Sequence, residues 1–175
     1  MASNNERNLK FVEYICKQCS SNKATAAHLR RADLKNSDPY VMTTLVKFGL
    51  DITKNSEFTP FCLVAAAIAR SKKYENEKSS FIQILSSVEK ENPKSSERDD
   101  SRFRRLLSCD SLTELALIFR HIMTFIQSKS DKSINYSELL DDLYSFNYEE
   151  WRARTKRKWT MQFYNCPREK ELMEK

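Results

Sequence analysis

Apolar residues recur at helical spacing through most of the chain and predict a succession of helices. In residues 101–109, for example, Phe103, Leu106 and Leu107 share one face, and the arginines beside them point elsewhere. The expected helices cover residues 5–19, 24–34, 38–48, 59–73, 79–90, 101–109, 111–127, 135–146 and 148–164. We therefore predict an all-α fold, with eight or nine helices in two small packed bundles.

Polar residues that stand directly before the apolar runs predict N-caps. They are Asp38, Thr59, Ser111 and Asn135. Pro39 and Pro60 then suit the first helical position, and Glu114 can complete a capping box with the serine three residues before it. Gly49 is expected to end the helix that begins near residue 39.

A polar stretch near the middle of the chain predicts a boundary between two lobes. Residues 89–100 contain no apolar side chain except Pro93, which is typical of an exposed loop. We therefore expect an N-terminal helical lobe over residues 1–90, an exposed linker over 91–100 and a C-terminal helical lobe over 101–175.

The chain has 175 residues and a single glycine, Gly49. Phosphate-binding loops, dinucleotide fingerprints and nucleophile elbows need glycines, because their backbone turns tightly or approaches a ligand closely. Tight β-hairpins favour glycine as well. The composition therefore argues against nucleotide-hydrolysing and Rossmann enzymes.

The chain has five cysteines: Cys16, Cys19, Cys62, Cys109 and Cys166. Their number is odd and no secretory signal opens the chain, so we expect reduced thiols and a cytoplasmic location. The pair Cys16 and Cys19 lacks the second ligand pair of a structural zinc site, so we interpret it as two helical thiols near the core. We expect no cofactor, and no apolar run is long enough to predict a membrane span.

Few other side chains suggest catalysis. His28 and His121 are the only histidines, and no sequence partner marks either as a general base. The grouped carboxylates at 141–142 and 149–150 allow a metal-dependent enzyme as one interpretation. Their helical spacing beside lysines and arginines instead favours a solvated face or salt bridges to the basic helix that follows. We therefore expect a protein that is not an enzyme.

Positive charge is the strongest remaining feature, with 30 Lys and Arg against 24 Asp and Glu. On one helix alone, a solvated basic back is the simplest interpretation. Basic clusters on several helices favour a nucleic-acid backbone as the partner, and an acidic protein partner for a helical adaptor is the alternative. The candidate nucleic-acid-binding residues are Arg30, Arg31, Arg70, Arg102, Arg104, Arg105, Arg120, Lys156, Arg157 and Lys158.

The last expected helix carries an aromatic stripe. The stripe consists of Trp151, Thr155, Trp159 and Phe163. Because the two tryptophans share one face, we expect both in the core rather than on a base-stacking surface. Arg152 falls inside the stripe and should be structural, whereas Arg157 should point outward.

Several segments resemble, in order and spacing, the CasB family, the small subunit of the type I-E CRISPR surveillance complex Cascade. The similarity covers residues 24–164 and is most specific in LRRADL (29–34) and RFRRLLSCDSLTELALIFRHI (102–122). It implies an all-helical, non-enzymatic subunit that stabilises the R-loop by holding nucleic-acid phosphates. The implied partners are the backbone and large subunits, a second copy of the chain, the crRNA and the target DNA with its displaced strand.

The resemblance also carries the basic positions of the family onto this chain. They fall on Arg30, Arg31, Arg102, Arg104, Arg105, Arg120 and the run that ends at Lys158. Family members often have a Gly-Arg pair near residue 82, and this chain has Ile82 and Gln83 there.

Overall fold

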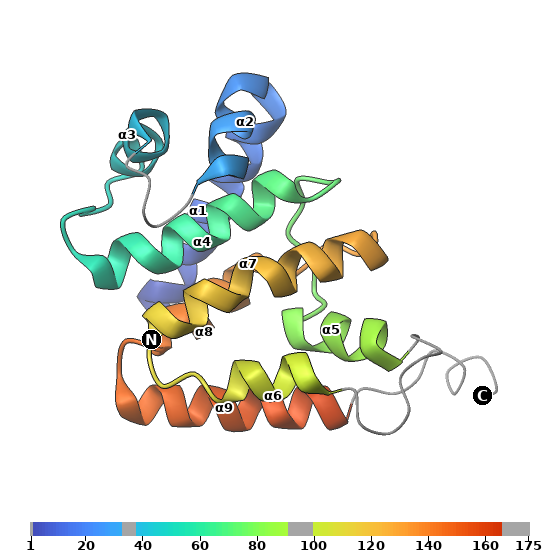
Figure 1. Cartoon of the computed structure of the whole chain (residues 1–175). Helices are drawn as coiled ribbons and strands as arrows, with labels where there is room; N and C mark the ends of the chain where they lie inside the picture. The colour runs from blue at the N-terminus through green and yellow to red at the C-terminus, as the bar shows by residue number, and fades with distance from the viewer. Residues whose placement is uncertain (1, 33–37, 91–99, 166–175) are drawn as a thin grey trace.

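The regular structure of the described residues is helical (Figure 1). The computed structural model describes residues 2–32, 38–90 and 100–165. The helices in these ranges are α1 (Ala2–Ser21), α2 (Lys23–Arg31), α3 (Pro39–Lys47), α4 (Asn55–Arg70), α5 (Phe81–Lys90), α6 (Ser101–Leu107), α7 (Leu112–Lys129), α8 (Tyr136–Ser145) and α9 (Glu149–Tyr164). The all-α prediction is confirmed, and none of these helices is long and apolar enough to cross a membrane.

Three of the predicted N-caps are confirmed: Asp38, Ser111 and Asn135. Their side-chain oxygens accept hydrogen bonds, at 2.8, 3.1 and 3.0 Å, from backbone N–H groups two or three residues later. Gly49 follows α3 with φ of 92°, a left-handed conformation that suits glycine at a helix end. Local sequence therefore determines these helix ends.

The start of α4 differs from the prediction. The helix begins at Asn55, so Thr59 and Pro60 lie inside it. Because proline has no N–H, the carbonyl of Ser56, four residues earlier, loses its helical donor. The side-chain amide of Asn147, between α8 and α9, donates to this carbonyl at 3.1 Å. A tertiary hydrogen bond thus replaces the missing helical one.

Helices from both halves of the chain pack on one another. Both α1 and α4 contact α8, α4 also contacts α7, and α5 lies against α9. In Figure 1, α2 and α3 lie on one side of α4, whereas α6 and α9 lie on the other side, beyond α7. One cluster of buried side chains includes Phe11, Phe61, Leu140 and Trp159. Residues 91–99 lie outside the described ranges, and the division into lobes at 91–100 stays a prediction.

Candidate nucleic-acid interface

Helices α6 and α9 lie side by side and run in opposite directions, and we call them the α6–α9 pair (Figure 1). The rings of Phe103 and Phe163 stack with centroids 4.0 Å apart and planes at 2°. The Tyr164 hydroxyl, at the end of α9, donates to Asp100, directly before α6, at 2.6 Å. This packing buries the apolar side of each helix and leaves the opposite sides to solvent.

Two of the exposed arginines of the α6–α9 pair are Arg105 in α6 and Arg157 in α9. Each lies on the side of its helix away from the stacked phenylalanine rings. Within the described ranges, neither side chain makes a hydrogen bond or an ion pair. The same holds for Arg120 in α7 and Arg31 in α2. These four predicted residues can therefore meet an anion without breaking a contact to any residue that the structure describes.

Two further predicted residues of the α6–α9 pair form surface ion pairs. Arg104 Nε lies 2.6 Å from Asp100 Oδ1, and Lys156 Nζ lies 3.0 Å from Asp110 Oδ1. Hydrogen bonds from Tyr164 and then Arg104 hold the pKa of Asp100 below its ordinary value. Each pair has one well-exposed partner, so water screens the pair and it contributes little free energy. An incoming phosphate group can therefore compete with either carboxylate.

Arg102 packs against the protein, although the sequence placed it with the exposed arginines. Its guanidinium carbon lies 3.8 Å from the ring centroid of Phe125 in α7. Its Nη1 lies 3.7 Å from Oε1 of the buried Glu89 in α5. A cation over an aromatic ring and beside a buried carboxylate is held in place. Arg102 therefore joins α5, α6 and α7.

Arg30 and Arg70 also bind backbone carbonyls of the protein. Arg30 Nε donates to the carbonyl of Ala69 at 2.6 Å, and its Nη2 donates to the Tyr74 hydroxyl at 2.7 Å. Arg70 Nη2 donates to the carbonyl of Ala32 at 3.4 Å. These bonds connect α2 to α4 and its C-terminal connection. The two arginines thus have a structural contact that the sequence pattern did not reveal.

Lys158 lies on another side of α9, among acidic side chains. Its Nζ lies 2.6 Å from Asp142 Oδ1 and 2.8 Å from Glu138 Oε1. The indole N–H of Trp159 donates to Asp142 Oδ2 at 2.8 Å. The predicted salt bridge between the acidic run and the last helix is therefore confirmed at Asp142. The ammonium group of Lys158 already has anionic partners.

Burial and neighbouring charges shift the pKa values of Asp142 and Lys158 in opposite directions. Burial raises the pKa of Asp142 to about 6, against the effect of Lys158 and Trp159. Burial lowers the pKa of Lys158, but Asp142 and Glu138 more than offset this, so the pKa is raised. At pH 7 both Asp142 and Lys158 are charged, and their pair lies in the seam between α8 and α9.

The sequence model of one protein family, described as CRISPR-associated protein Cse2, matches residues 25–164. The chain belongs to the CRISPR-associated protein Cse2 family. The match covers the segments on which the resemblance to CasB rests. No curated protein matches the sequence.

Solved structures show the same fold as this Cse2-family chain. The crystal structure of M. ruber CasB has a TM-score of 0.71 and 24% identity, over 91% of this chain and 93% of that one. CasB from Thermus thermophilus has a TM-score of 0.66 and 22% identity, over 90% and 97% of the two chains. A chain of a CRISPR RNA-guided surveillance complex has a TM-score of 0.71 and 13% identity, over 94% of both.

The two tryptophans of the Cse2-family chain have different surroundings. Trp159 is 1% exposed, as predicted, but Trp151 is 45% exposed, and the prediction was wrong for it. Trp151 lies in the first turn of α9, where the aromatic stripe extends beyond the core. Its ring centroid is 5.5 Å from that of the half-exposed Tyr148. Arg152 Nη1 donates to the Phe146 carbonyl at 3.4 Å.

Of the remaining candidate side chains, His28 and the two cysteines of α1 are held by the fold, whereas His121 is exposed on α7. His28 Nδ1 lies 2.8 Å from Asp38 Oδ2, which connects α2 to the start of α3. Cys16 and Cys19 are free thiols in α1, as predicted, and burial raises the pKa of each to about 11. Cys166 lies outside the described residues. Within those residues, no group of three or more His, Cys, Asp or Glu side chains can hold a metal ion.

Proposed function

We propose that this protein is the non-catalytic small subunit of a type I-E CRISPR surveillance complex. In this role it contacts the backbone and large subunits and a second copy of itself. It holds phosphates of the crRNA and of the target DNA, including the displaced strand, and so stabilises the R-loop. Membership of the Cse2 family and the CasB fold support this proposal. So does the similarity in fold to a chain of a CRISPR RNA-guided surveillance complex.

One observation carries the nucleic-acid part of the proposal. Arg31, Arg105, Arg120 and Arg157 are exposed on helices and have no ion pair within the described residues. A guanidinium group always carries its charge and matches the geometry of a phosphate. Arginines on rigid helices contact the backbone and leave the reading of sequence to base pairing.

The test removes two of these arginines together. The double variant Arg105→Ala with Arg157→Ala should bind single-stranded and duplex DNA more weakly, whatever their sequence. Each lost phosphate contact should flatten the plot of log affinity against log salt by roughly 0.7 to 0.9. A matched control is Lys10→Ala with Lys54→Ala, because both lysines are exposed but form ion pairs with Glu6 and Asp51. The control should keep the slope of the native protein.

A reconstituted complex provides the second measurement. The arginine double variant should leave guide binding intact and shorten the lifetime of the R-loop. An unchanged salt slope and an unchanged R-loop lifetime would remove these arginines from the interface. Normal DNA binding with loss of a protein subunit would instead support the alternative, a helical adaptor for an acidic protein.

The non-catalytic part of the proposal has its own test. The purified protein should not cleave single-stranded or duplex nucleic acid, with or without divalent metal ions. Magnesium-dependent cleavage that disappears in the variant Asp141→Ala would contradict it, because Asp141 belongs to the carboxylate run that suggested a metal-dependent enzyme.

A further inference from the structure

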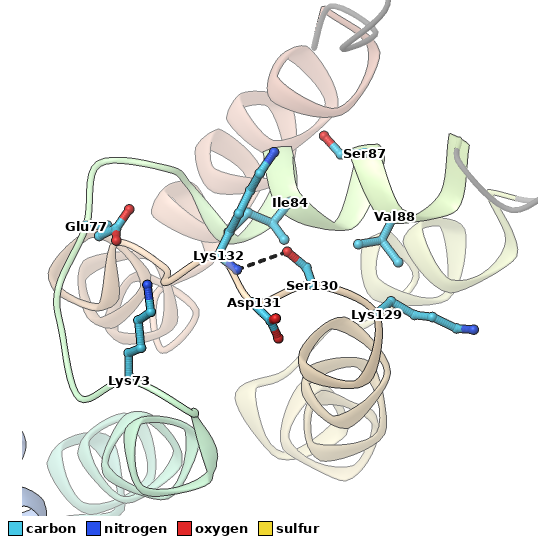
Figure 2. A pocket seen from close by; sticks show the side chains of 9 residues that line it. All are labelled: Lys73, Glu77, Ile84, Ser87, Val88, Lys129, Ser130, Asp131 and Lys132. Carbon is cyan, nitrogen blue, oxygen red and sulfur yellow. Dashed lines mark hydrogen bonds between the residues drawn. The ribbon is translucent and has the colours of Figure 1, made fainter.

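A pocket of about 460 Å³ lies between segments that are distant in the sequence (Figure 2). Its volume falls in the range of sites that hold small ligands or a few side chains of a partner. We call it the lysine pocket. It is formed by the connection between α4 and α5 (Lys73, Glu77), by α5 (Ile84, Val88) and by the end of α7 with the loop that follows (Lys129, Lys132).

Backbone hydrogen bonds hold two walls of the lysine pocket together. The N–H of Glu77 donates to the carbonyl of Ile134 at 3.2 Å, and the N–H of Asn135 donates to the carbonyl of Ser79 at 2.8 Å. The α4–α5 connection is thereby tied to the α7–α8 loop. A pocket with fixed walls loses little entropy when it binds a partner.

The mouth of the lysine pocket is basic. Figure 2 shows Lys73, Lys129 and Lys132 around it, each on a different side of Asp131. Within the described residues, Lys73 and Lys129 form no ion pair. Lys72 pairs with Asp131 and so offsets the charge of that carboxylate. The pocket therefore attracts negative charge.

The rest of the lining favours an acidic peptide over a nucleic acid as the anionic partner. Ile84 and Val88 are buried apolar side chains of α5, and the lining has no aromatic residue on which a base could stack. A peptide can instead place its own carboxylates against the lysines, an apolar side chain against Ile84 and Val88, and its N–H groups toward the acidic side chains of the lining.

We infer that the lysine pocket docks a segment of a neighbouring protein subunit that combines acidic and apolar residues. This inference rests on the proposed function, because it names the surface by which the small subunit holds a neighbour in the complex. The lysine pocket and the exposed arginines of the α6–α9 pair then have separate partners, one protein and one nucleic acid.

Photo-crosslinking in the assembled complex tests the inference and distinguishes it from the proposed function. A photoreactive amino acid replaces Ser87, which lines the pocket. This replacement leaves every lysine of the pocket in place. In a second protein it replaces Arg105 on the α6–α9 pair. We expect Ser87 to crosslink to a protein segment that contains Asp or Glu beside an apolar residue, and Arg105 to crosslink to nucleic acid.

Any other crosslinking result contradicts either the docking inference or the proposed function, but not both. Crosslinks from Ser87 to nucleic acid, to a protein segment without acidic residues, or to nothing would overturn the docking inference and leave the proposed function standing. Crosslinks from Arg105 to protein alone would count against the nucleic-acid part of the proposed function.

A charge-reversal experiment on the purified protein gives an independent measurement. The probe is a fluorescent peptide of alternating Glu and Leu, compared with a single-stranded oligothymidylate. Lys73→Glu with Lys129→Glu should weaken peptide binding by at least about tenfold. A matched control, Lys17→Glu with Lys23→Glu on α1 and α2, should leave it unchanged. Equal weakening in both double variants, or no peptide binding to the native protein, would overturn the inference.

Discussion

Two adjacent residues of α9 carry the same charge in opposite surroundings. Arg157 points to solvent and has no ion pair within the described residues, whereas Lys158 contacts Glu138 and Asp142. One step along a helix turns the side chain by about 100°, so one cation lies on the outer surface and the next in the seam with α8. The nearest buried acid, rather than the number of basic residues, decides whether a cation is available to a phosphate.

The pH dependence of stability tests the buried side of this comparison. The pKa of Asp142 is about 6 in the folded protein, against an ordinary value of 3.8, so the folded state holds the proton more tightly than the unfolded state. As the pH rises through this window, the group lowers the free energy of unfolding, by up to about 3 kcal/mol. Above the window its effect is constant.

Asp142→Asn removes this titration and so isolates it. Chemical denaturation of both proteins should show the variant gaining stability relative to the native protein as the pH rises from about 4 to about 6. Titrating groups that do not interact with Asp142 cancel in the difference between the two proteins. A difference that does not change with pH would show that Asp142 titrates normally.

Asp142→Ala should have the next largest effect. The indole N–H of Trp159 would lose its acceptor inside the protein, which costs about 2 kcal/mol of unfolding free energy at pH 7. Asp142→Asn should cost less, because the amide oxygen can still accept this hydrogen bond. The control is Asp131→Ala, whose partner Lys72 is exposed, and it should leave stability unchanged. Equal losses of unfolding free energy in Asp142→Ala and Asp131→Ala would contradict the claim that Asp142 is buried between α8 and α9.

Arg102→Ala should destabilise the protein, although Arg105→Ala on the same helix should not. Loss of the contact with Phe125 and of the ion pair with Glu89 should lower the unfolding free energy by about 1.5 kcal/mol. Arg105 is exposed, so its removal should change stability by less than about 0.5 kcal/mol. Thermal unfolding of both variants measures the contrast, and two negligible losses would mean that Arg102 is as free as Arg105.

The smallest expected effect concerns Arg152, compared with Arg157. The half-buried Arg152 donates to the Phe146 carbonyl, and its loss should cost about 0.5 to 1 kcal/mol. Arg157→Ala should cost nothing measurable. Denaturant titrations of the two variants measure this difference in unfolding free energy, provided that the free energy depends equally steeply on denaturant concentration in both. A greater loss for Arg157 would contradict the orientation of α9.

Local sequence sufficed for much of the fold. The caps at Asp38, Ser111 and Asn135 follow from side chains that reach their own backbone, so they can be predicted from a few residues. The same holds for Gly49, whose conformation other residues avoid. The start of α4 could not be predicted. Pro60 fits inside this helix because the side chain of Asn147, far away in the sequence, supplies the hydrogen bond that proline cannot donate.

The candidate site was less predictable for a physical reason. Helical spacing shows which way Arg102 and Arg105 point, but it does not show what lies there. Arg102 has Phe125 and Glu89 beside it, and both come from other helices. The lysine pocket was missed altogether, because the chain brings its walls together only on folding. Trp151 was wrongly predicted to lie in the core, because an apolar stripe on a helix can extend beyond the core that it faces.

The contact between the first helix and α8 has a consequence for how the protein is made. Asn8 Nδ2 donates to Asp141 Oδ1 at 2.6 Å, across a separation of 133 residues. Because 133 residues separate the two side chains, the ribosome synthesises α1 long before α8. The side of α1 that α8 covers must therefore stay soluble, or be shielded by a chaperone, until α8 has been made. The contact between α1 and α8 can therefore form only after α8 has emerged from the ribosome.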